Sequence, residues 1–473
     1  MTALTLALAS PALAQPGARD PAAVPSTSAS TAPAATASAS PGAPTVLLPP
    51  VIGTRPAVPG AAPGTAPSGP GTVAVAVPPT PIVEPVMPWT LADARALLDT
   101  IDGIAAEGLT AADYRPEVLR AAIRTGEGDA LDQAASKSFA WLAEDLREGR
   151  TPVEARVQWF AVDTDREAFP TETLMAQALS NHDVPGVLQS LTPTVPDYAA
   201  LKQALADAPA TDKARRALIR ANMDRWRWLA RDLGDVYLLT NVPEFQLRLT
   251  VKNRIIRTYR TVVGKPGKTA TPQLAETVKA VVFNPTWTVP QSIVVGEGLG
   301  AKLLANPGSA VAQGYKVTKA ADGYVTVVQQ PGDSNSLGRM KIDMPNPHAI
   351  YLHDTPQKAL FMRPIRAFSH GCIRTERAVE LGMTMGILGA GLDPAAAADI
   401  SRSGKYTKVS MTRTFPVYIT YFTIARDIGG ELKTFGDIYG RDGPVLASFK
   451  APREEKTDQR ISADPVIKLD NPL

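Results

Sequence analysis

The residues of this chain that could do chemistry gather around its one cysteine, Cys372. It stands in the stretch Phe368-Ser-His-Gly-Cys-Ile-Arg374, and His353 stands 19 residues before it, at the end of the apolar run Ile350-Tyr-Leu. A thiol becomes a strong nucleophile once a base removes its proton, and imidazole is a common base. The pattern therefore predicts a cysteine nucleophile with a histidine partner.

Two histidines could serve as the base. His370 is two residues from Cys372, and neighbours on one chain rarely meet in the direction that proton transfer needs. A base normally comes from a separate segment, which favours His353 and leaves His370 to support the loop. Gly371 removes side-chain bulk beside the sulfur, and the N–H groups of the loop can form an oxyanion hole. We also expect a strand-to-helix junction here, with a helix from about Thr375 whose positive end acts on the thiolate.

Two other interpretations of these residues stay open. A lone cysteine is often a small buried hydrophobe. His348, His353, His370 and Cys372 could ligate zinc, but their spacing, H-x4-H and H-x-C, fits no usual zinc pattern. One cysteine also excludes an intramolecular disulfide and a cysteine framework for a metal. We therefore expect no metal and no cofactor.

The periodic segments of the chain predict an α+β multidomain protein. Over residues 89–231 apolar residues recur at three- and four-residue spacing, as in amphipathic helices, so we expect an all-α unit there. Over 232–445 the period changes to that of strands, with one helix expected at 375–388. The strand-like runs are 236–242, 244–251, 254–263, 277–284, 315–328, 349–353 and 416–424.

The two ends of the chain differ from its middle. Residues 1–14 are a short apolar segment that ends in Ala12-Leu-Ala14, the A-x-A form of a signal-peptidase site. Residues 15–88 hold 18 of the 43 prolines, no aromatic residue and four charges, so we expect a disordered linker. We expect residues 446–473 to be a C-terminal tail. No later run reaches 18 apolar residues, which argues against a transmembrane helix.

Length and charge narrow the classes of protein. A chain of 473 residues exceeds one ordinary domain. Its 49 Lys and Arg nearly balance its 46 Asp and Glu, for a net charge of +3. Nucleic-acid binders usually show a strong basic excess, so we expect no nucleic-acid partner.

The motif around Cys372 strongly resembles the signature of L,D-transpeptidases, the YkuD-like catalytic domain of peptidoglycan cross-linking. That signature is a His some 16 residues before Ser/Thr-x-Gly-Cys-x-Arg/Asn, and His353 lies 16 residues before Ser369. Further stretches resemble the larger Gram-negative branch of this family over about residues 90–445. They are Asn222-Met-Asp-Arg-Trp-Arg-Trp-Leu229, Val281-Val-Phe-Asn-Pro-Thr-Trp-Thr-Val-Pro290, Ile350-Tyr-Leu-His-Asp-Thr-Pro356 and Phe435-Gly-Asp-Ile-Tyr-Gly-Arg-Asp442.

The resemblance implies roles for particular residues. Cys372 would be the nucleophile and His353 its base, with Ser369, His370 and Gly371 supporting the loop. The backbone carbonyl of Asp354 would orient the histidine ring, while a structural role fits its side chain better. Arg374 would support the loop or meet a substrate carboxylate, and Tyr351 and Trp287 would line the donor cleft. The segment 291–345 would be a capping subdomain, with mobile stretches at 296–300 and 331–336 that could act as a lid.

The function implied by the resemblance is a periplasmic transpeptidase that needs no metal or nucleotide. Cys372 would attack a tetrapeptide stem, release D-Ala, and pass the acyl group to an amine on a neighbouring stem; carbapenems would acylate the same sulfur. Peptidoglycan stem peptides would be donor and acceptor, and other proteins of cell-wall synthesis are candidate partners. Cell-shape maintenance belongs to the same expectation.

Three rival functions fit the order of residues less well. An NlpC-like peptidase places its Cys before its His along the chain, whereas here His353 precedes Cys372. A sortase-like enzyme needs an Arg well downstream on its own strand, whereas Arg374 is two residues away. A non-catalytic wall-binding protein of this fold would be marked by loss of the Cys or the His, and both are present.

Overall fold

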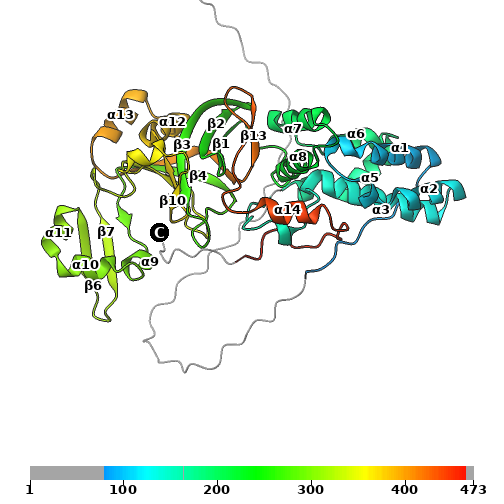
Figure 1. Ribbon diagram of the computed structural model, residues 1–473. Helices are drawn as coiled ribbons and strands as arrows, with labels where there is room; N and C mark the ends of the chain where they lie inside the picture. The colour runs from blue at the N-terminus through cyan, green and yellow to red at the C-terminus, as the bar shows by residue number, and fades with distance from the viewer. Residues whose placement is uncertain (1–78, 163, 465–473) are drawn as a thin grey trace, which may run out of the picture. The chain divides into compact units, whose positions relative to one another are not determined.

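The computed structural model describes residues 79–162 and 164–464 (Figure 1). The predicted signal peptide, 1–14, and the predicted linker as far as residue 78 lie outside these residues. Within the described part no helix is long and apolar enough to cross a bilayer.

Helices make up the first part of the described chain, as the periodicity predicts. Leu97, Ile101, Leu131, Phe139 and Leu142 are buried at the centre of one core. The last two helices of this part are separated by residues 208–212, which include Pro209. The α-helices are α1 Leu91–Asp102, α2 Pro116–Thr125, α3 Asp129–Glu148, α4 Asp165–Ala168, α5 Thr171–Ser180, α6 Val184–Gln189, α7 Pro196–Asp207 and α8 Lys213–Trp226, and the 3-10 turns are η1 Ile104–Glu107, η2 Ala111–Tyr114 and η3 Val153–Ala155.

A nine-stranded sheet follows, in the order β10-β3-β11-β9-β8-β4-β12-β1-β2. Strand β2 also pairs with β3, so the order returns on itself and eight strands close into a barrel with β10 beside β3. Closure leaves few strand edges open to other chains. The strands are β1 Val236–Asn241, β2 Gln246–Val251, β3 Arg254–Gly264, β4 Leu274–Phe283, β8 Met340–Asp343, β9 Leu352–His353, β10 Ala367–Ser369, β11 Ile373–Thr375 and β12 Thr407–Thr420.

Several of the expected elements in this domain have different bounds. The run expected at 315–328 forms two strands, Tyr315–Lys319 and Val325–Gln329, and the strand expected at 349–353 is only Leu352–His353. The strand expected at 416–424 starts earlier, at Thr407, because β12 pairs with the full length of β4. The helix expected from Thr375 begins at Ala378, as α12 Ala378–Ala390, because Thr375 pairs with Thr261 and belongs to β11. A second helix, α13 Pro394–Arg402, packs against α12, and η4 Lys358–Met362 lies between β9 and β10.

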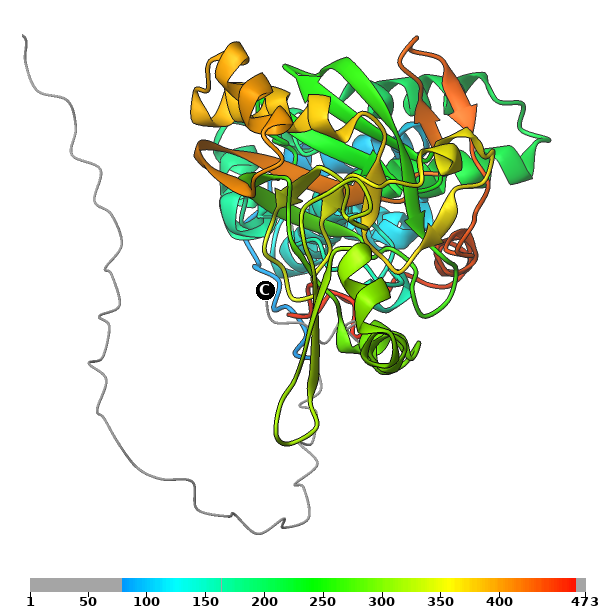
Figure 2. The same ribbon diagram turned by 90° about the vertical axis from the view of Figure 1, so that its left-hand side faces the viewer.

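A small subdomain is inserted between β4 and β8. Its sheet consists of β5 Trp287–Thr288, β7 Val325–Gln329 and β6 Tyr315–Lys319, and β6 and β7 form a hairpin (Figure 2). Helices α9 Gln291–Val294, α10 Leu299–Ala305 and α11 Pro307–Ala312 complete it, around a core that includes Val289, Leu303 and Val327. We call residues 287–339 the cap. The predicted bounds, 291–345, ran too far, because residues 340–343 form β8 and pair with β4 in the barrel.

One stretch expected to be mobile is held by hydrogen bonds. In the segment 331–336 the side chain of Asn335 is buried and donates to the carbonyl oxygens of Pro285 at 3.0 Å and Gln330 at 2.9 Å. Its own carbonyl accepts from the N–H of Leu337 at 2.8 Å. A sequence rich in Gly, Ser and Asn can thus also supply a side chain that braces a turn, and the mobility of 331–336 stays a prediction.

Helix α8 joins the helical part to the barrel. The side chain of Asn222 donates to the hydroxyl of Thr423 at 3.0 Å and accepts from its N–H at 2.9 Å. Trp226 stacks on Phe422 with ring centroids 4.3 Å apart. The remaining elements here are β13 Ile424–Arg426, β14 Leu432–Thr434 and α14 Asp442–Ser448. The Asn222–Leu229 stretch thus serves as an interface.

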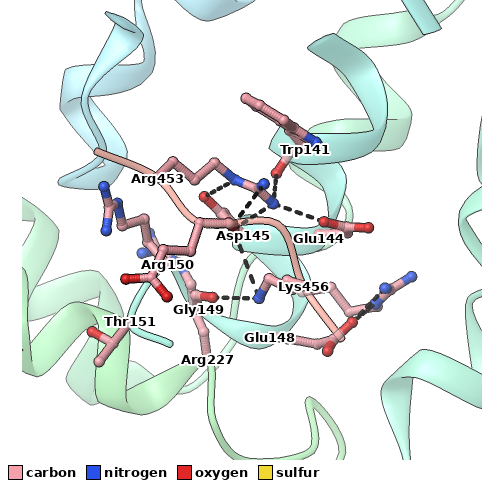
Figure 3. A network of polar contacts seen from close by, with 12 residues as sticks. Trp141, Glu144, Asp145, Glu148, Gly149, Arg150, Thr151, Arg227, Arg453 and Lys456 are labelled. Atoms are coloured by element: carbon pink, nitrogen blue, oxygen red, sulfur yellow. Dashed lines mark hydrogen bonds and ion pairs between the residues drawn. The ribbon is translucent and has the colours of Figure 1, made fainter. Parts of the chain in front are cut away.

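Both ends of the described chain pack on helix α3. Residues 79–88, which we expected to be linker, begin with a bridge between Pro81 and Thr457, and the N–H of Met87 donates to the Ser136 hydroxyl at 3.0 Å. The linker prediction thus extends too far, because these partners lie elsewhere in the chain. From the predicted tail, Arg453 reaches Glu144 and Asp145 (Figure 3).

Candidate functional site

The pairing of β9 with β11 sets the positions of the candidate catalytic residues. The two strands run parallel, with Ile373 opposite Leu352 and Arg374 opposite His353. The N–H of Ile373 donates to the carbonyl of Tyr351 at 3.0 Å. Because side chains alternate along strands, Cys372, which directly precedes β11, shares a face with Tyr351 and His353.

The turn that presents Cys372 is held by its own side chains. The Ser369 hydroxyl donates to the Cys372 carbonyl at 2.6 Å and accepts from the N–H of Gly371 at 3.2 Å. Gly371 has φ +121°, and a Cβ there would lie 3.1 Å from Cδ1 of Ile350, so glycine is required. Ser369 is therefore a brace of the turn, and it already engages one N–H that we expected in an oxyanion hole.

The thiol of Cys372 is in a poorly solvated place. Burial raises its pKa to about 11, while hydrogen bonds from Tyr351 and the positive charges of Lys341 and Arg374 act in the opposite direction. The sulfur lies 3.6 Å from the carbonyl oxygen of Ala349. The expected helix dipole does not act here, because β11 separates Cys372 from α12. At neutral pH the resting group is therefore a thiol.

The imidazole of His353 is buried and neutral. It is 5% exposed, and among the residues described Nδ1 has no hydrogen-bond partner. Burial and the charge of Arg374 lower its pKa to about 3, against opposing backbone contacts with Asp354 and Leu337. Its ring meets that of Tyr351 edge-on at 5.5 Å between centroids. A neutral imidazole can accept a proton, as a general base must.

The other polar side chains near the motif, those of His370, Asp354 and Arg374, interact with groups other than the Cys372 thiol. His370 Nε2 lies 2.8 Å from Oε1 of Glu297 in the cap, so it ties the catalytic turn to that subdomain. The Asp354 carboxylate accepts from the N–H of Arg339 at 3.0 Å, in keeping with a structural role for its side chain. Arg374 donates to the Gln357 side chain at 2.7 Å.

A cleft of about 270 Å³ lies between the cap and the barrel. Its lining brings together two predicted residues, Trp287 and Tyr351, and the Tyr351 hydroxyl is hydrogen-bonded to both Trp287 and Cys372. Ala349 also lines it. Cys372, His353 and Arg374 are absent from the lining, which approaches the thiol through Tyr351 and Ala349, and a substrate contact of Arg374 stays a prediction.

Three charged residues of the cleft were missed by sequence reasoning: Lys341, Asp343 and Lys408. They carry no motif. The alternation Met340-Lys-Ile-Asp343 is a strand pattern that could have indicated that Lys341 and Asp343 share a face. In the part of the chain that the structure describes, no three His, Cys, Asp or Glu side chains are grouped so that they could hold a metal ion.

The sequence matches two family models. Residues 235–382 match the L,D-transpeptidase catalytic domain, YkuD, and residues 88–205 match a Scaffold domain. A putative L,D-transpeptidase of Haemophilus influenzae is 30% identical over 224 residues, which cover 44% of this chain and 45% of that protein. The match thus spans about half the length of this curated relative.

Solved structures are similar at lower identity. An L,D-transpeptidase from Mycobacterium smegmatis is 16% identical, with 39% of this chain and 58% of that chain covered and a TM-score of 0.21. L,D-transpeptidase 3 from Mycobacterium tuberculosis, in complex with a faropenem-derived adduct, is 13% identical, with 39% and 60% covered and a TM-score of 0.21. On the strength of the family models, this chain carries a Scaffold domain followed by an L,D-transpeptidase catalytic domain of the YkuD type.

Proposed function

We propose that this chain is a peptidoglycan L,D-transpeptidase that forms an acyl-enzyme on Cys372. The observation that supports it most is the shared face of β9 and β11. The thiol of Cys372, the chain's only one, lies beside Tyr351 and on the same face as the neutral imidazole of His353. Tyr351 lines a cleft large enough for part of a peptide.

The reaction proceeds in two acyl transfers. The Cys372 sulfur attacks the carbonyl between the L-centre of the third stem residue and the terminal D-Ala, and His353 takes the thiol proton. The C–N bond breaks, D-Ala leaves as an amine that receives this proton from His353, and a thioester remains. An amine at the D-centre of a neighbouring stem then attacks the thioester and gives a proton to His353. The thiol is restored when His353 returns that proton to the sulfur.

The two pKa values determine when the proton moves. With a thiol near 11 and an imidazole near 3, a separated thiolate–imidazolium pair is disfavoured in the empty site. The proton therefore passes as the sulfur attacks the carbonyl. Binding of a polar stem peptide beside both groups also changes their solvation, which helps the transfer once substrate is present.

The proposal includes the compartment and the class of inhibitor. Stem peptides are cross-linked outside the cytoplasm, so the protein acts in the periplasm, reached through the signal at 1–14. Acceptors are amines of neighbouring stems. Carbapenems acylate Cys372, because a strained lactam presents the sulfur with a carbonyl that is more easily attacked than that of an ordinary amide.

The test is incubation of the full chain with purified disaccharide-tetrapeptides, followed by mass spectrometry. The expected products are free D-Ala, cross-linked dimer and a thioester on Cys372. Cys372→Ala should give none of them while it melts at the same temperature. Dimer formation by Cys372→Ala would contradict the mechanism, and binding of peptidoglycan without any turnover would favour a non-catalytic wall-binding protein.

A further inference from the structure

The cleft between the cap and the barrel contains a cluster of three charges. Nζ of Lys408 lies 2.8 Å from Oδ2 of Asp343, and Nζ of Lys341 lies 3.8 Å from Oδ1 of the same carboxylate. Two ammonium groups thus share one carboxylate, which leaves a net positive charge. All three residues line the cleft, so this charge faces the space that a substrate would occupy.

Lys341 is the member of the cluster nearest to the chemistry. In the pairing of β8 with β9 it stands opposite His353. Its Nζ lies 4.4 Å from the centroid of the Tyr351 ring, whose hydroxyl is hydrogen-bonded to Cys372. One side chain therefore separates this ammonium from the nucleophile.

Lys341 is held where an ammonium has lost much of its water. Its side chain is 12% exposed, against 48% for Lys408, and burial lowers its pKa. A dehydrated cation is costly unless an anion compensates it. The carboxylate of Asp343 is shared between the two lysines, and it lies farther from Lys341, at 3.8 Å, than from Lys408, at 2.8 Å. Lys341 can therefore pair with a second anion in the cleft.

We propose that Lys341, with Lys408 behind Asp343, forms a subsite for a carboxylate of the stem peptide. The inference rests on the proposed function and adds the substrate contact that was expected of Arg374. Two carboxylates of a tetrapeptide donor share this chemistry: the one on the side chain of the third residue and the one of the terminal D-Ala. A bound carboxylate would fix the scissile carbonyl beside the sulfur, because the subsite and Cys372 contact the same Tyr351.

The experiment combines variants of the full chain with modified donors. Wild type, Lys341→Met and Lys341→Arg are compared on three tetrapeptides: the free acid, one amidated at the third-residue carboxylate, and one amidated at D-Ala. A hydrogen bond to a charged group contributes about 1.5–3 kcal/mol, so amidation of the contacted carboxylate should lower kcat/KM of wild type about 10- to 100-fold. Lys341→Met should lose as much on the free acid and no more on that amide.

The pattern identifies which carboxylate is bound. If amidation of one carboxylate lowers kcat/KM in wild type but not in Lys341→Met, that carboxylate is the one that Lys341 contacts. Lys341→Arg should still prefer the acid over that amide, but less strongly than wild type. Lys319→Met, which removes an exposed lysine of β6, is the matched control and should behave as wild type. If both amidations cost Lys341→Met as much as they cost wild type, the subsite is refuted.

Two further measurements distinguish a substrate contact from stabilisation of the thiolate. Alkylation of Cys372 by the neutral reagent iodoacetamide should change less than threefold in Lys341→Met. A large fall in that rate with an unchanged acid-to-amide ratio would assign Lys341 to thiolate stabilisation and overturn the subsite. The dissociation constants of the acid and amide donors, measured on Cys372→Ala with and without Lys341→Met, report the contact in the absence of turnover. Discrimination in binding without any turnover in wild type would refute the proposed function and leave the subsite intact.

Discussion

Two poorly solvated polar sites in this molecule follow opposite rules. Against helix α3, the side chain of Arg453 is 2% exposed, and its guanidinium lies 2.7 Å from Glu144 and 3.1 Å from Asp145, while Lys456 reaches the same Asp145 at 3.7 Å (Figure 3). We call these four residues the clasp. At the candidate active site His353 is buried and Cys372 half-buried, and neither has an ion pair among the described residues. Buried charges persist when they are paired, whereas unpaired titratable groups become neutral.

The contrast separates a group of charges that holds the fold from a pair that can move a proton. In the clasp the carboxylates raise the pKa of Arg453 against the effect of burial, so its charge is fixed, whereas burial raises the pKa of Glu144 and lowers that of Lys456. At Cys372 and His353 burial shifts both pKa values toward the neutral forms. Neutral groups next to a cleft can change protonation state during a reaction, and the following experiments test whether the two sites differ in this way.

The largest expected effect is on turnover. General acid–base assistance is worth roughly 10²–10⁴-fold, so His353→Ala should lower transpeptidation by at least that factor. The variant should stay folded, but its melting temperature should fall by a few degrees, because the buried imidazole leaves a cavity. Steady-state kinetics and calorimetry on the same sample check both points. A fall of only a few-fold, with His370→Ala worse, would move the base to His370.

The state of the thiol gives the next effect. With a pKa of about 11, the thiolate fraction of Cys372 rises tenfold per pH unit below that value. The rate of alkylation by iodoacetamide should therefore increase about 1000-fold between pH 7 and pH 10, with Cys372→Ala as the unreactive control. A rate that is already constant across neutral pH would reveal a resting thiolate–imidazolium pair and erase the contrast with the clasp.

Breaking the clasp should affect stability and spare chemistry. Arg453→Met leaves Glu144 and Asp145 buried without their main partner, which costs about 3–5 kcal/mol of unfolding free energy. Lys137→Met is the matched control, since its ion pair with Glu455 is 3.1 Å long but exposed and should contribute below about 1 kcal/mol. Urea unfolding measures both. Equal losses in the two variants would show that burial does not distinguish these pairs.

Acid should lower the free energy of unfolding through the protonation of His353. Its folded pKa of about 3 lies below the ordinary value of 6.5, so between these values the unfolded chain binds more protons. Stability is therefore intact above pH 6.5 and is lost as the pH falls toward 3. His353→Phe, which cannot be protonated, should lose less stability over this window. An identical pH dependence in denaturant melts of the two proteins would contradict the assigned pKa.

The smallest effect concerns the contact between the catalytic turn and the cap. The pair of His370 and Glu297 is partly exposed, at 40% and 54% of the side chains, and such pairs are worth about 0.2–1 kcal/mol. Glu297→Gln should change kcat by less than tenfold and raise hydrolysis to tripeptide slightly relative to dimer. Chromatography of the muropeptide products gives that ratio. A loss as large as that of His353→Ala would place Glu297 in the chemistry.

Local geometry could be predicted from the sequence, and long-range pairing could not. The need for glycine at 371 follows from residue type at short spacing and agrees with its positive φ, whereas the catalytic roles of Cys372 and His353 stay predictions. The position of Lys341 opposite His353 depends on the register of β8 against β9, which no local pattern encodes. The helix expected from Thr375 begins three residues later for the same reason, since Thr375 pairs with Thr261 of β3 and ends β11.

The limits of the ordered part were mispredicted for a related reason. Residues 79–88 have the composition of a linker, yet they bind segments more than 40 positions away, such as Ser136 and Asp458. Composition reports how much apolar surface a segment can bury by itself. Composition does not report whether a distant part of the chain offers hydrogen-bond partners to the segment.

The meeting of the two ends of the described chain gives it a preferred order of mechanical failure. The N–H of Asp458 donates to Thr80 at 3.0 Å and the N–H of Ile82 donates to Lys456 at 2.9 Å, in an antiparallel arrangement. Tension between Pro79 and the residues after Asp458 would load these bonds one at a time, as a zipper opens. The contacts of Arg460 with Glu167 and of Ser462 with Trp159, together with the clasp around Arg453, also resist this tension. A pull between the ends would thus be absorbed far along the chain from Cys372, before the barrel carries any load.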